Sequence, residues 1–499
     1  MPDAVVVSRA RRSHARAALV LAALLLATTG TSASEGRAAD APAAAGAGSG
    51  AVAGVGTGLG APGGVQHAQI PLYQQAVSVL PDGARGEVPA DAVAVYLAAP
   101  AAAVAGSRPA TRVPDPAAAV LAAALGSTPT TTTPLGPAAA AHAADEQLSW
   151  LAAGDVPGQG GPHEELARAA LLDLHSLTVA DGVVVAGWSE SWRYVWPRDS
   201  SFVAVALART GHVDDALDVL DFLERVQAPD GSFEARYLPD GSGPPDGRGV
   251  QTDGTGWAMW SAGLVLAEVD DARRPEVARR LAPLVERSAG HALQLVAGGL
   301  PPASPDYWEV AESDVTLGTA APLVAGLEQA AVVLAAAGRP APAAAAAAGA
   351  AAARQAVVDA FAPTGYGRYT TRALPDAASA FVLAPFWGQA PVDGAAAWRA
   401  SVPSMLRPAA GLAPGAGWRR DGVSWTPQTT LYAWVAAEQG DVAAAARWLD
   451  VVDAHRTPSG AIPEKLLADG APAAVAPLGW SAACVLLAID ALDARRATA

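Results

Sequence analysis

Apolar residues recur at helical spacing along most of the chain after residue 144. In residues 163–174, apolar side chains fall at positions 166, 170, 171 and 174, which share one face of a helix. Comparable runs predict further helices at 200–210, 213–226, 255–269, 274–295, 315–337, 343–361, 427–439, 443–454 and 478–492. Strand signals are few, and residues 183–185 carry the best of them. The pattern predicts an all-α domain.

Short segments rich in Gly, Pro and Asp separate most of these runs, for example residues 229–231, 239–249 and 298–305. Roughly ten to twelve helices joined by alternating short and long loops favour a closed toroid of antiparallel helix pairs over a four-helix bundle. The long loops collect Trp, Asp and Glu, so we expect the functional site there.

Aromatic residues mark where the folded domain begins. All fourteen Trp lie between Trp150 and Trp480, and only Tyr73 and Tyr96 precede them. Residues 34–143 are rich in small residues and proline, which predicts a low-complexity linker with at most a short β segment at 69–99. We therefore expect the folded domain to span residues 144–499.

The N-terminus has the pattern of a secretory signal peptide. Four arginines between positions 9 and 16 precede an apolar run at 17–27, and small residues follow. The run is shorter than the ~20 apolar residues that span a bilayer. We expect residues 1–33 to direct secretion without stable membrane insertion; an uncleaved anchor with cell-envelope association is the alternative.

Charge and cysteine content exclude several classes of protein. The net charge is −15 and the sequence pI is about 4.9, so no basic stripe is available to bind nucleic acid. A single cysteine, Cys484, excludes an internal disulfide framework and a multi-Cys zinc site. The eight His show no His-Glu-x-x-His spacing. We expect no metal, no cofactor and no nucleic-acid partner.

Residues 191–199 form the first of three loops that could carry chemistry. Tyr194 and Trp196 stand there beside Arg198 and Asp199. Aromatic faces stack on the C–H faces of a sugar, and an Arg–Asp pair can bind its hydroxyl groups. The plainer interpretation is that Asp199 caps the following helix while Arg198 lies at the surface.

The second loop, residues 305–314, contains Asp306, Trp308 and Glu309. A glutamate beside aromatic rings would be poorly solvated, which would raise its pKa and suit a general acid. The plainer interpretation is an acidic helix start, which the helix dipole favours.

The third loop, residues 460–465, places Glu464 between a proline and the only lysine, Lys465. The plainer interpretation is a surface ion pair, which contributes little stability. Taken together, however, two glutamates on separate loops, flanked by Trp and accompanied by an Arg–Asp pair, match the needs of glycoside hydrolysis. One carboxylic acid protonates the leaving oxygen, and one carboxylate activates water or attacks the sugar directly.

These motifs occur in a characteristic order along the chain. They are Tyr194-Val-Trp196-Pro-Arg198-Asp199, Gln251-Thr-Asp253-Gly254, Pro305-Asp306-Tyr-Trp308-Glu309, Pro463-Glu464 and Pro477-Leu-Gly-Trp480-Ser481. The set resembles glycoside hydrolase family 15, which holds the glucoamylases, the glucodextranases and a branch of the trehalases. The resemblance covers residues 188–492.

The resemblance implies an (α/α)6 barrel that hydrolyses an oligo- or polysaccharide with inversion at the anomeric carbon. It implies that Glu309 is the general acid and Glu464 the general base. The substrate-binding residues that it implies are Arg198, Asp199, Trp196, Tyr194, Asp253, Trp308, Trp480, Arg419 and Trp425. It leaves open whether the bond cleaved is α-1,4, α-1,6 or the α,α-1,1 bond of trehalose.

Three departures from the family pattern support a different class, and one of them is that the Gly/Pro-rich loop around Arg419 is shortened. Val310 stands where fungal members carry a second glutamate, and residues before 144 do not resemble the β-sandwich usual in bacterial members. The alternative is a catalytically silent toroid that binds glycans at the cell envelope. A phosphorylase is less favoured because it would need a basic pocket. An isoprenoid enzyme is disfavoured because the acidic cluster at 214–218 has no second copy.

Overall fold

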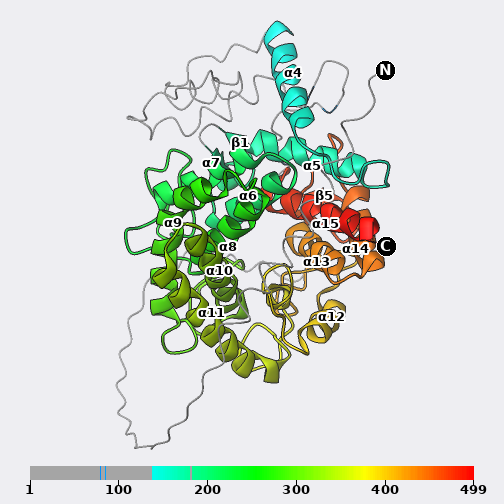
Figure 1. Ribbon diagram of the computed structural model, residues 1–499. Coiled ribbons are helices and arrows are strands. Elements are labelled where there is room, and N and C mark those ends of the chain that lie inside the picture. Colours follow the sequence, from blue (N-terminus) through cyan, green and yellow to red (C-terminus); the bar gives the residue numbers. More distant parts are fainter. Residues whose placement is uncertain (1–72, 74–78, 80–84, 86–136, 180–181, 499) are drawn as a thin grey trace, which may run out of the picture. The chain divides into compact units, whose positions relative to one another are not determined.

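The computed structural model describes residues 73, 79, 85, 137–179 and 182–498 (Figure 1). The chain divides into two compact units, Met1–Ile70 and Pro71–Ala499, and every described residue belongs to the second. The signal peptide expected at 1–33 lies outside the described residues, as does most of the linker expected at 34–143. Of the β segment expected at 69–99, only Tyr73, Val79 and Arg85 are described.

Six elements form an inner ring in the second unit (Figure 1). In ring order they are α6(Pro197–Arg209), α8(Asp253–Glu268), α10(Leu317–Ala336), the 3-10 helix η5(Ala377–Val382), α13(Thr426–Glu438) and α15(Gly479–Thr498). Each packs on the next, and α15 packs on α6, so the ring closes.

Each inner element has an outer helix as its main partner. The outer helices, in the same order, are α7(Val213–Val226), α9(Arg274–Leu295), α11(Pro340–Phe361), α12(Gly394–Met405), α14(Val442–Ala454) and α5(Glu164–Leu177). Some inner elements, such as α10 with α9, also pack on a second outer helix. The helix α5 precedes the first inner helix in sequence but packs on the last, α15. The six pairs confirm the predicted all-α (α/α)6 toroid.

Small residues allow the inner helices to pack closely. In α8, a Cβ on Gly256 would lie 2.4 Å from the backbone of Pro322 in α10, so only glycine fits at this contact. The helix α10 is long and apolar enough to cross a membrane, but 72% of its apolar window is buried inside the protein. It therefore has the character of a core helix.

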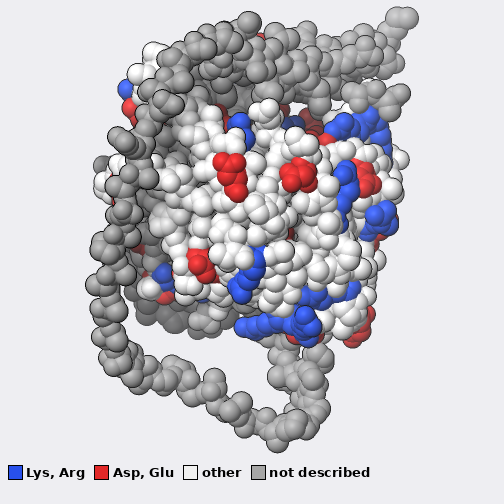
Figure 2. All heavy atoms as spheres, turned by 90° about the horizontal axis from the view of Figure 1, so that it is seen from below, with Lys and Arg blue, Asp and Glu red and all other residues white. Residues whose placement is uncertain are grey.

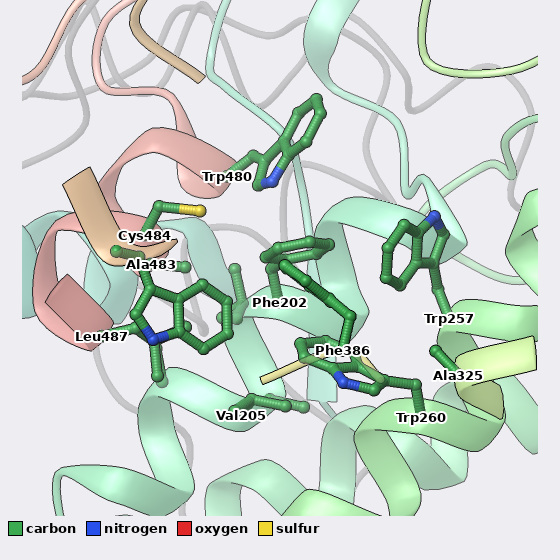
Figure 3. Packing of buried hydrophobic residues seen from close by; sticks show 14 of the residues in the cluster. Phe202, Val205, Trp257, Trp260, Ala325, Phe386, Trp480, Ala483, Cys484 and Leu487 are labelled. Atoms are coloured by element: carbon green, nitrogen blue, oxygen red, sulfur yellow. The ribbon is translucent and has the colours of Figure 1, made fainter. Parts of the chain in front are cut away.

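Aromatic side chains fill the centre of the ring (Figure 3). Phe202 of α6 packs at ring-centroid distances of 5.1 Å from both Trp257 and Trp260 of α8 and 5.5 Å from Trp480 of α15. Phe386, which follows η5, completes this cluster at 6.0 Å from Phe202. Residues from most of the inner ring thus meet in one apolar cluster.

The remaining elements are short or lie outside the ring. They are α4(Pro137–Ala153), η3(Glu190–Trp192), η4(Ala362–Thr364), β1(Thr178–Val179), β2(Val183–Val184), β3(Ser424–Trp425), β4(Lys465–Leu466) and β5(Pro472–Ala473). The strand expected at 183–185 is β2, which pairs with β1. On the face seen in Figure 2, much of the described surface is uncharged, and the acidic and basic side chains stand singly or in small mixed groups, as the 16% charged composition suggests.

Two elements of the ring were absent from the helices predicted above. The run of Gly, Ala and Ser in α12 carries few large apolar residues, so its periodicity is weak. The inner element η5 is too short to show a helical period at all. Most other helices begin or end within three residues of their predicted bounds, and α6 begins three residues early, at Pro197.

Candidate active site

The predicted site residues gather at one end of the inner ring. Arg198 and Asp199 lie in the first turn of α6, and Asp253 begins α8. Glu309 lies in the loop before α10, and Glu464 in the loop before α15. Because an outer helix leads back along the ring between one inner element and the next, all inner helices start at the same end. Their N-termini carry partial positive charge, which favours carboxylates there.

The structure rejects both helix-start interpretations of these acids. Asp199 is the third residue of α6, whose N-cap is Trp196, and its side chain is buried. Glu309 lies in an irregular loop, and α10 is capped instead by the side chain of Thr316. Local helix capping therefore does not explain why these acids are where they are.

Arg198 is the centre of a buried group of charges. Its guanidinium lies 3.4 Å from Asp199, 3.5 Å from Asp253 and 3.2 Å from Glu309. It also lies 5.0 Å from the ring centroid of Trp480, a cation–π distance. Four residues from separate parts of the chain, the farthest of them 282 positions from Arg198 in sequence, thus contact this one side chain.

Burial dominates the protonation of the two aspartates. It raises the pKa of Asp199 to about 6, with Arg198 opposing the rise and Glu309 and Glu464 adding to it. It raises the pKa of Asp253 to about 7, again against the effect of Arg198. Burial lowers the pKa of Arg198, but the neighbouring acids outweigh burial and raise it above its ordinary value.

The carboxylate of Glu309 is held by polar groups. Arg198 donates to Oε1 at 3.2 Å, Arg248 to Oε2 at 2.8 Å, and Gln251 to Oε1 at 3.4 Å. The side chain is 25% exposed. The sequence-based expectation that Tyr307 and Trp308 would desolvate this carboxyl group is therefore wrong, because two guanidinium groups and an amide surround it instead.

Backbone geometry presents Glu309 in an unusual conformation. Its φ is 56°, in the left-handed region that non-glycine residues rarely adopt. The turn is fixed from beneath by Asp306, whose side chain is fully buried and accepts from the backbone N–H of Trp308 at 2.9 Å. The Glu309 N–H donates to the Asp306 carbonyl at 2.8 Å.

Arg368 anchors this turn from the protein interior. Its fully buried guanidinium donates to Asp306 at 2.9 Å and to Glu312 at 2.6 Å, and pairs with Asp376 at 3.4 Å. It also lies 3.8 Å from the ring centroid of Trp308. Burial raises the pKa of Asp376 to about 6, although Arg368 opposes the rise.

Glu464 is buried; one of its carboxylate oxygens accepts a hydrogen bond, and the other has an ion pair but no hydrogen bond among the described residues. Trp192 donates from Nε1 to Oε1 at 3.2 Å, and the ammonium of Lys465 lies 3.2 Å from Oε2. The Glu464 N–H donates to the carbonyl of Val475 at 2.8 Å. The Glu464–Lys465 pair expected from the sequence therefore exists, but it is not the surface pair of the plainer interpretation.

Three indole rings connect the surroundings of the two glutamates. Trp308 packs on Trp418 at 4.9 Å, and Trp418 on Trp425 at 5.5 Å. Trp425 in turn lies 4.2 Å beneath the ammonium of Lys465. This row of rings, which runs from the neighbour of Glu309 to the neighbour of Glu464, is the contact path that joins the two loops.

The remaining predicted residues have different surroundings. Tyr194 and Trp196 pack against the guanidinium of Arg236, at 4.3 and 5.1 Å from their ring centroids. Arg419 is exposed and lies 5.8 Å from the ring of Trp418, so it belongs to the rim and not to the buried charges.

Sequence reasoning missed four residues of this site: Arg236, Arg248, Arg368 and Trp418. Each comes from a loop without a recognisable motif. The one available signal was Arg368 itself, which stands between two tyrosines and shortly before Asp376 in a segment otherwise poor in charge.

The fold has well-defined counterparts among solved structures. A wild-type glycosidase matches with a TM-score of 0.57 and 24% identity, over 66% of this chain and 96% of its own. A variant of a glycosidase in complex with glucose matches equally well. A bacterial glucoamylase complexed with acarbose matches with a TM-score of 0.56 and 16% identity, over 70% of this chain and 58% of its own. The fold is thus that of a glycosidase toroid.

Sequence comparison gives a shorter match. An uncharacterized glycosyl hydrolase from Methanocaldococcus jannaschii is 30% identical over 146 residues, which are 29% of this chain and 23% of that protein. No protein-family model matches the chain. The resemblance to glucoamylase-like proteins is confirmed at the level of the fold.

Proposed function

We propose that the protein is a secreted, inverting glycoside hydrolase that releases glucose from the non-reducing ends of α-glucans or α-glucosides. The observation that carries the proposal is the arrangement of the two loops at one end of the ring: Glu309 contacts Arg198 beside Asp199, and a row of indole rings leads from Trp308 to the Glu464–Lys465 pair. Glu309 would act as the general acid and Glu464 as the general base.

The surroundings of the two glutamates suit the hydroxyl groups of a sugar. Arg198, Asp199 and Asp253 offer charged hydrogen-bonding groups in a buried setting, where such bonds are strongest. Seven buried indole N–H groups find no acceptor among the described residues, and five of them belong to the site: those of Trp196, Trp308, Trp418, Trp425 and Trp480. Buried donors usually have a partner, and sugar hydroxyls or water would supply one.

The ring centre favours attack at a chain end. The cluster around Phe202 fills the middle of the ring beneath the site, so a glucan chain cannot thread through it (Figure 3). Only a terminal sugar residue would reach the charged group around Arg198. This supports release of single glucose units and not cleavage in the middle of a chain.

Both oxygens of Glu309 are occupied in this structure, so one must be released before it can donate a proton to a leaving group. Arg198 is buried, whereas the side chain of Arg248 is 42% exposed and comes from the loop between α7 and α8. We infer that the leaving sugar displaces Arg248. Glu464, held by Trp192 and Lys465, would meanwhile orient the attacking water.

The decisive experiment incubates the protein with maltose, isomaltose, trehalose and dextran and follows the released sugar by NMR. Inversion requires carboxyl groups about 6.5–9.5 Å apart and gives β-glucose from an α-linked substrate. The glucosyl unit whose anomeric bond is cleaved should appear first as β-glucose, while the leaving sugar keeps its own configuration, so trehalose should give β- and α-glucose in equal amounts. A lack of initial β-glucose from any cleaved substrate would contradict the inverting mechanism. The substrate that is cleaved fastest identifies the linkage.

Secretion is tested separately. Expression of the full chain and of a chain without residues 1–33, followed by fractionation, would place the first outside the cytoplasm and leave the second within it. Retention of both in the cytoplasm would contradict secretion.

One observation favours the alternative of a catalytically silent glycan-binding protein. The carboxylate of Glu309 is fully engaged by Arg198 and Arg248, which suits a structural ion pair. Saccharide binding without any product in the NMR experiment would support this alternative.

A further inference from the structure

Arg85 precedes the helical ring in sequence but contacts two of its parts. From α5, it binds the Ala169 carbonyl at 2.9 Å and the Asp173 carboxylate at 3.1 Å. It also donates to the carbonyls of Gly460 at 3.2 Å and Ser459 at 3.4 Å. One guanidinium therefore joins the last outer helix of the ring to the loop that leads into Glu464.

Asp173 connects the same two parts through its other oxygen. Its Oδ1 accepts from Arg85, and its Oδ2 accepts from the backbone N–H of Ile462 at 3.4 Å. Ile462 stands two positions before Glu464, and its carbonyl accepts from the N–H of Leu478 at 3.1 Å. Arg85 is thus connected to Glu464 through the carboxylate of Asp173 and the backbone from Ile462 to Glu464.

The surroundings of Arg85 show that the contact is built into the fold. Val79, whose carbonyl accepts from the Arg85 N–H at 3.3 Å, is buried in the main hydrophobic core. Gly460 has a φ of 80°, and a Cβ there would lie 3.5 Å from Arg85 Nε, so the guanidinium packs directly on this glycine. Burial raises the pKa of Asp173, and Arg85 opposes that rise.

We propose that Arg85 is a positioning residue for Glu464: it fixes the loop 457–464 to α5 and thereby holds the glutamate against Trp192. The catalytic consequence of this inference rests on the proposed function. The tether, by which we mean the contacts of Arg85 with α5 and with the loop 457–464, does not depend on that function. The inference also assigns a role to a residue from the segment between the predicted signal peptide and the ring.

The test compares Arg85→Gln and Arg85→Lys in the full chain with Arg209→Gln. Arg209 ends α6, at the opposite end of that helix from the site, and pairs with Glu268 at 2.9 Å. Glutamine removes the charge from Arg85, whereas lysine keeps the charge but cannot bind Asp173, Ala169 and Gly460 together. The three variants therefore separate stability from positioning.

We expect Arg85→Gln to lower kcat about 10–100-fold with KM within about twofold of wild type, because a misplaced base affects the chemical step more than binding. Arg85→Lys should retain the wild-type Tm and recover part of kcat. Arg209→Gln should lower Tm without changing kcat. A lowered Tm with unchanged kcat in Arg85→Gln would overturn the positioning role.

Hydrogen exchange of peptides covering residues 457–464 tests the tether without any activity. Arg85→Gln should accelerate exchange in this loop, while exchange at 305–312 and in Arg209→Gln stays as in wild type. Unchanged exchange at 457–464 would overturn the proposal outright. Accelerated exchange in a protein without hydrolase activity would retain the tether and refute the proposed function instead.

Discussion

Arg198 is the residue on which the charge balance of the site depends. Three buried or partly buried acids face its guanidinium, and Trp480 covers one side of it. Buried charges are tolerated only where they are paired and hydrogen-bonded. The same ion pairs fix the position of Glu309 relative to Asp199. Arg198 therefore both balances the charge of the acids and sets the geometry of the proposed catalytic group.

Replacing either glutamate by glutamine should remove most of the activity. We expect Glu309→Gln and Glu464→Gln each to lower kcat by about 10²–10⁴-fold, because glutamine can neither donate nor accept the required proton. Binding of a saccharide should persist, since the shape and the neighbouring hydrogen bonds remain. Steady-state kinetics and calorimetric titration with maltose measure the two effects.

Glu286 provides the matched control for these variants. It lies on the outer helix α9, and its carboxylate is 3.7 Å from the guanidinium of Arg339 at the surface. Glu286→Gln should leave kcat unchanged, since exposed ion pairs contribute little. Near-wild-type turnover by Glu309→Gln or Glu464→Gln would refute the assigned roles.

The buried carboxyl group of Asp253 predicts a dependence of stability on pH. Its pKa is raised to about 7 in the folded protein, above the value of an unfolded Asp. Between the unfolded pKa and about 7 the folded state therefore binds the extra proton, and stability falls as pH rises through this window. Asn lacks this titration.

Thermal unfolding of wild type and Asp253→Asn at pH 5, 6, 7 and 8 measures this effect. The Tm of wild type relative to the variant should fall from pH 5 to pH 7 and then level off. Asp199, whose pKa is also raised, is present in both proteins and cancels in the difference. A difference that is constant with pH would show that Asp253 stays ionised.

At the scale of elements, the loop from Asp306 to Glu312 depends on Arg368, which lies in a separate loop. Arg368 pairs with Asp306, Glu312 and Asp376 and covers the ring of Trp308. These contacts offset the cost of the left-handed backbone at Glu309. The loop is therefore a preorganised element and not a flexible connection.

Arg368→Met should destabilise the protein by about 3–5 kcal/mol, because it leaves three acids in the interior without a counter-charge. Activity should fall as well, since the Glu309 turn loses its support. Urea unfolding and kinetics below the unfolding transition measure the two effects.

Arg354 is the control at this scale. It joins α11 to α10 through an ion pair with Glu328. Glu328 lies in the second half of α10, whereas the site lies at the start of that helix. Arg354→Met should cost about 1 kcal/mol or less and leave kcat unchanged. Equal losses of activity in both variants would show that Arg368 acts only through global stability.

At the scale of the whole molecule, periodicity predicted most of the ring. Inner helices are buried on almost all sides, and outer helices on one face. Both patterns of apolar residues can be recognised in a short stretch of sequence. The helix α12 and the short η5 were not predicted, because neither carries enough large apolar residues to show a helical repeat. The contact of Val79 with the core was not predicted, because the sequence around it indicated only a short β segment and gave no pattern that would assign it to the helical ring.

The site was predictable only where motifs are local. The residues Arg198, Asp199 and Glu309 lie in compact motifs, and the structure brings them together as the motifs implied. Arg248 and Arg368 enter the site through tertiary contacts between loops, which leave no local pattern in the sequence. The prediction that Glu309 would be poorly solvated was wrong for the same reason: the charged groups that surround its carboxylate come from distant parts of the chain.

The aromatic centre makes ring closure a cooperative property of the molecule. Phe202 is fully buried and contacts rings from α8, α13 and α15 and Phe386 after η5. Phe202→Ala should destabilise the protein by about 3–5 kcal/mol. Because several inner elements lose a contact at once, urea unfolding followed by Trp fluorescence and by circular dichroism should still give one coincident transition.

Val392→Ala is the corresponding control, since this side chain is fully exposed and its truncation should change stability by no more than about 0.5 kcal/mol. Activity of Phe202→Ala, measured below its transition, should fall further than that of a variant equally destabilised at the periphery, because Phe202 also packs on Trp480, which covers Arg198. Two separate unfolding transitions in Phe202→Ala would show that the helix pairs fold as independent units around a centre that does not couple them.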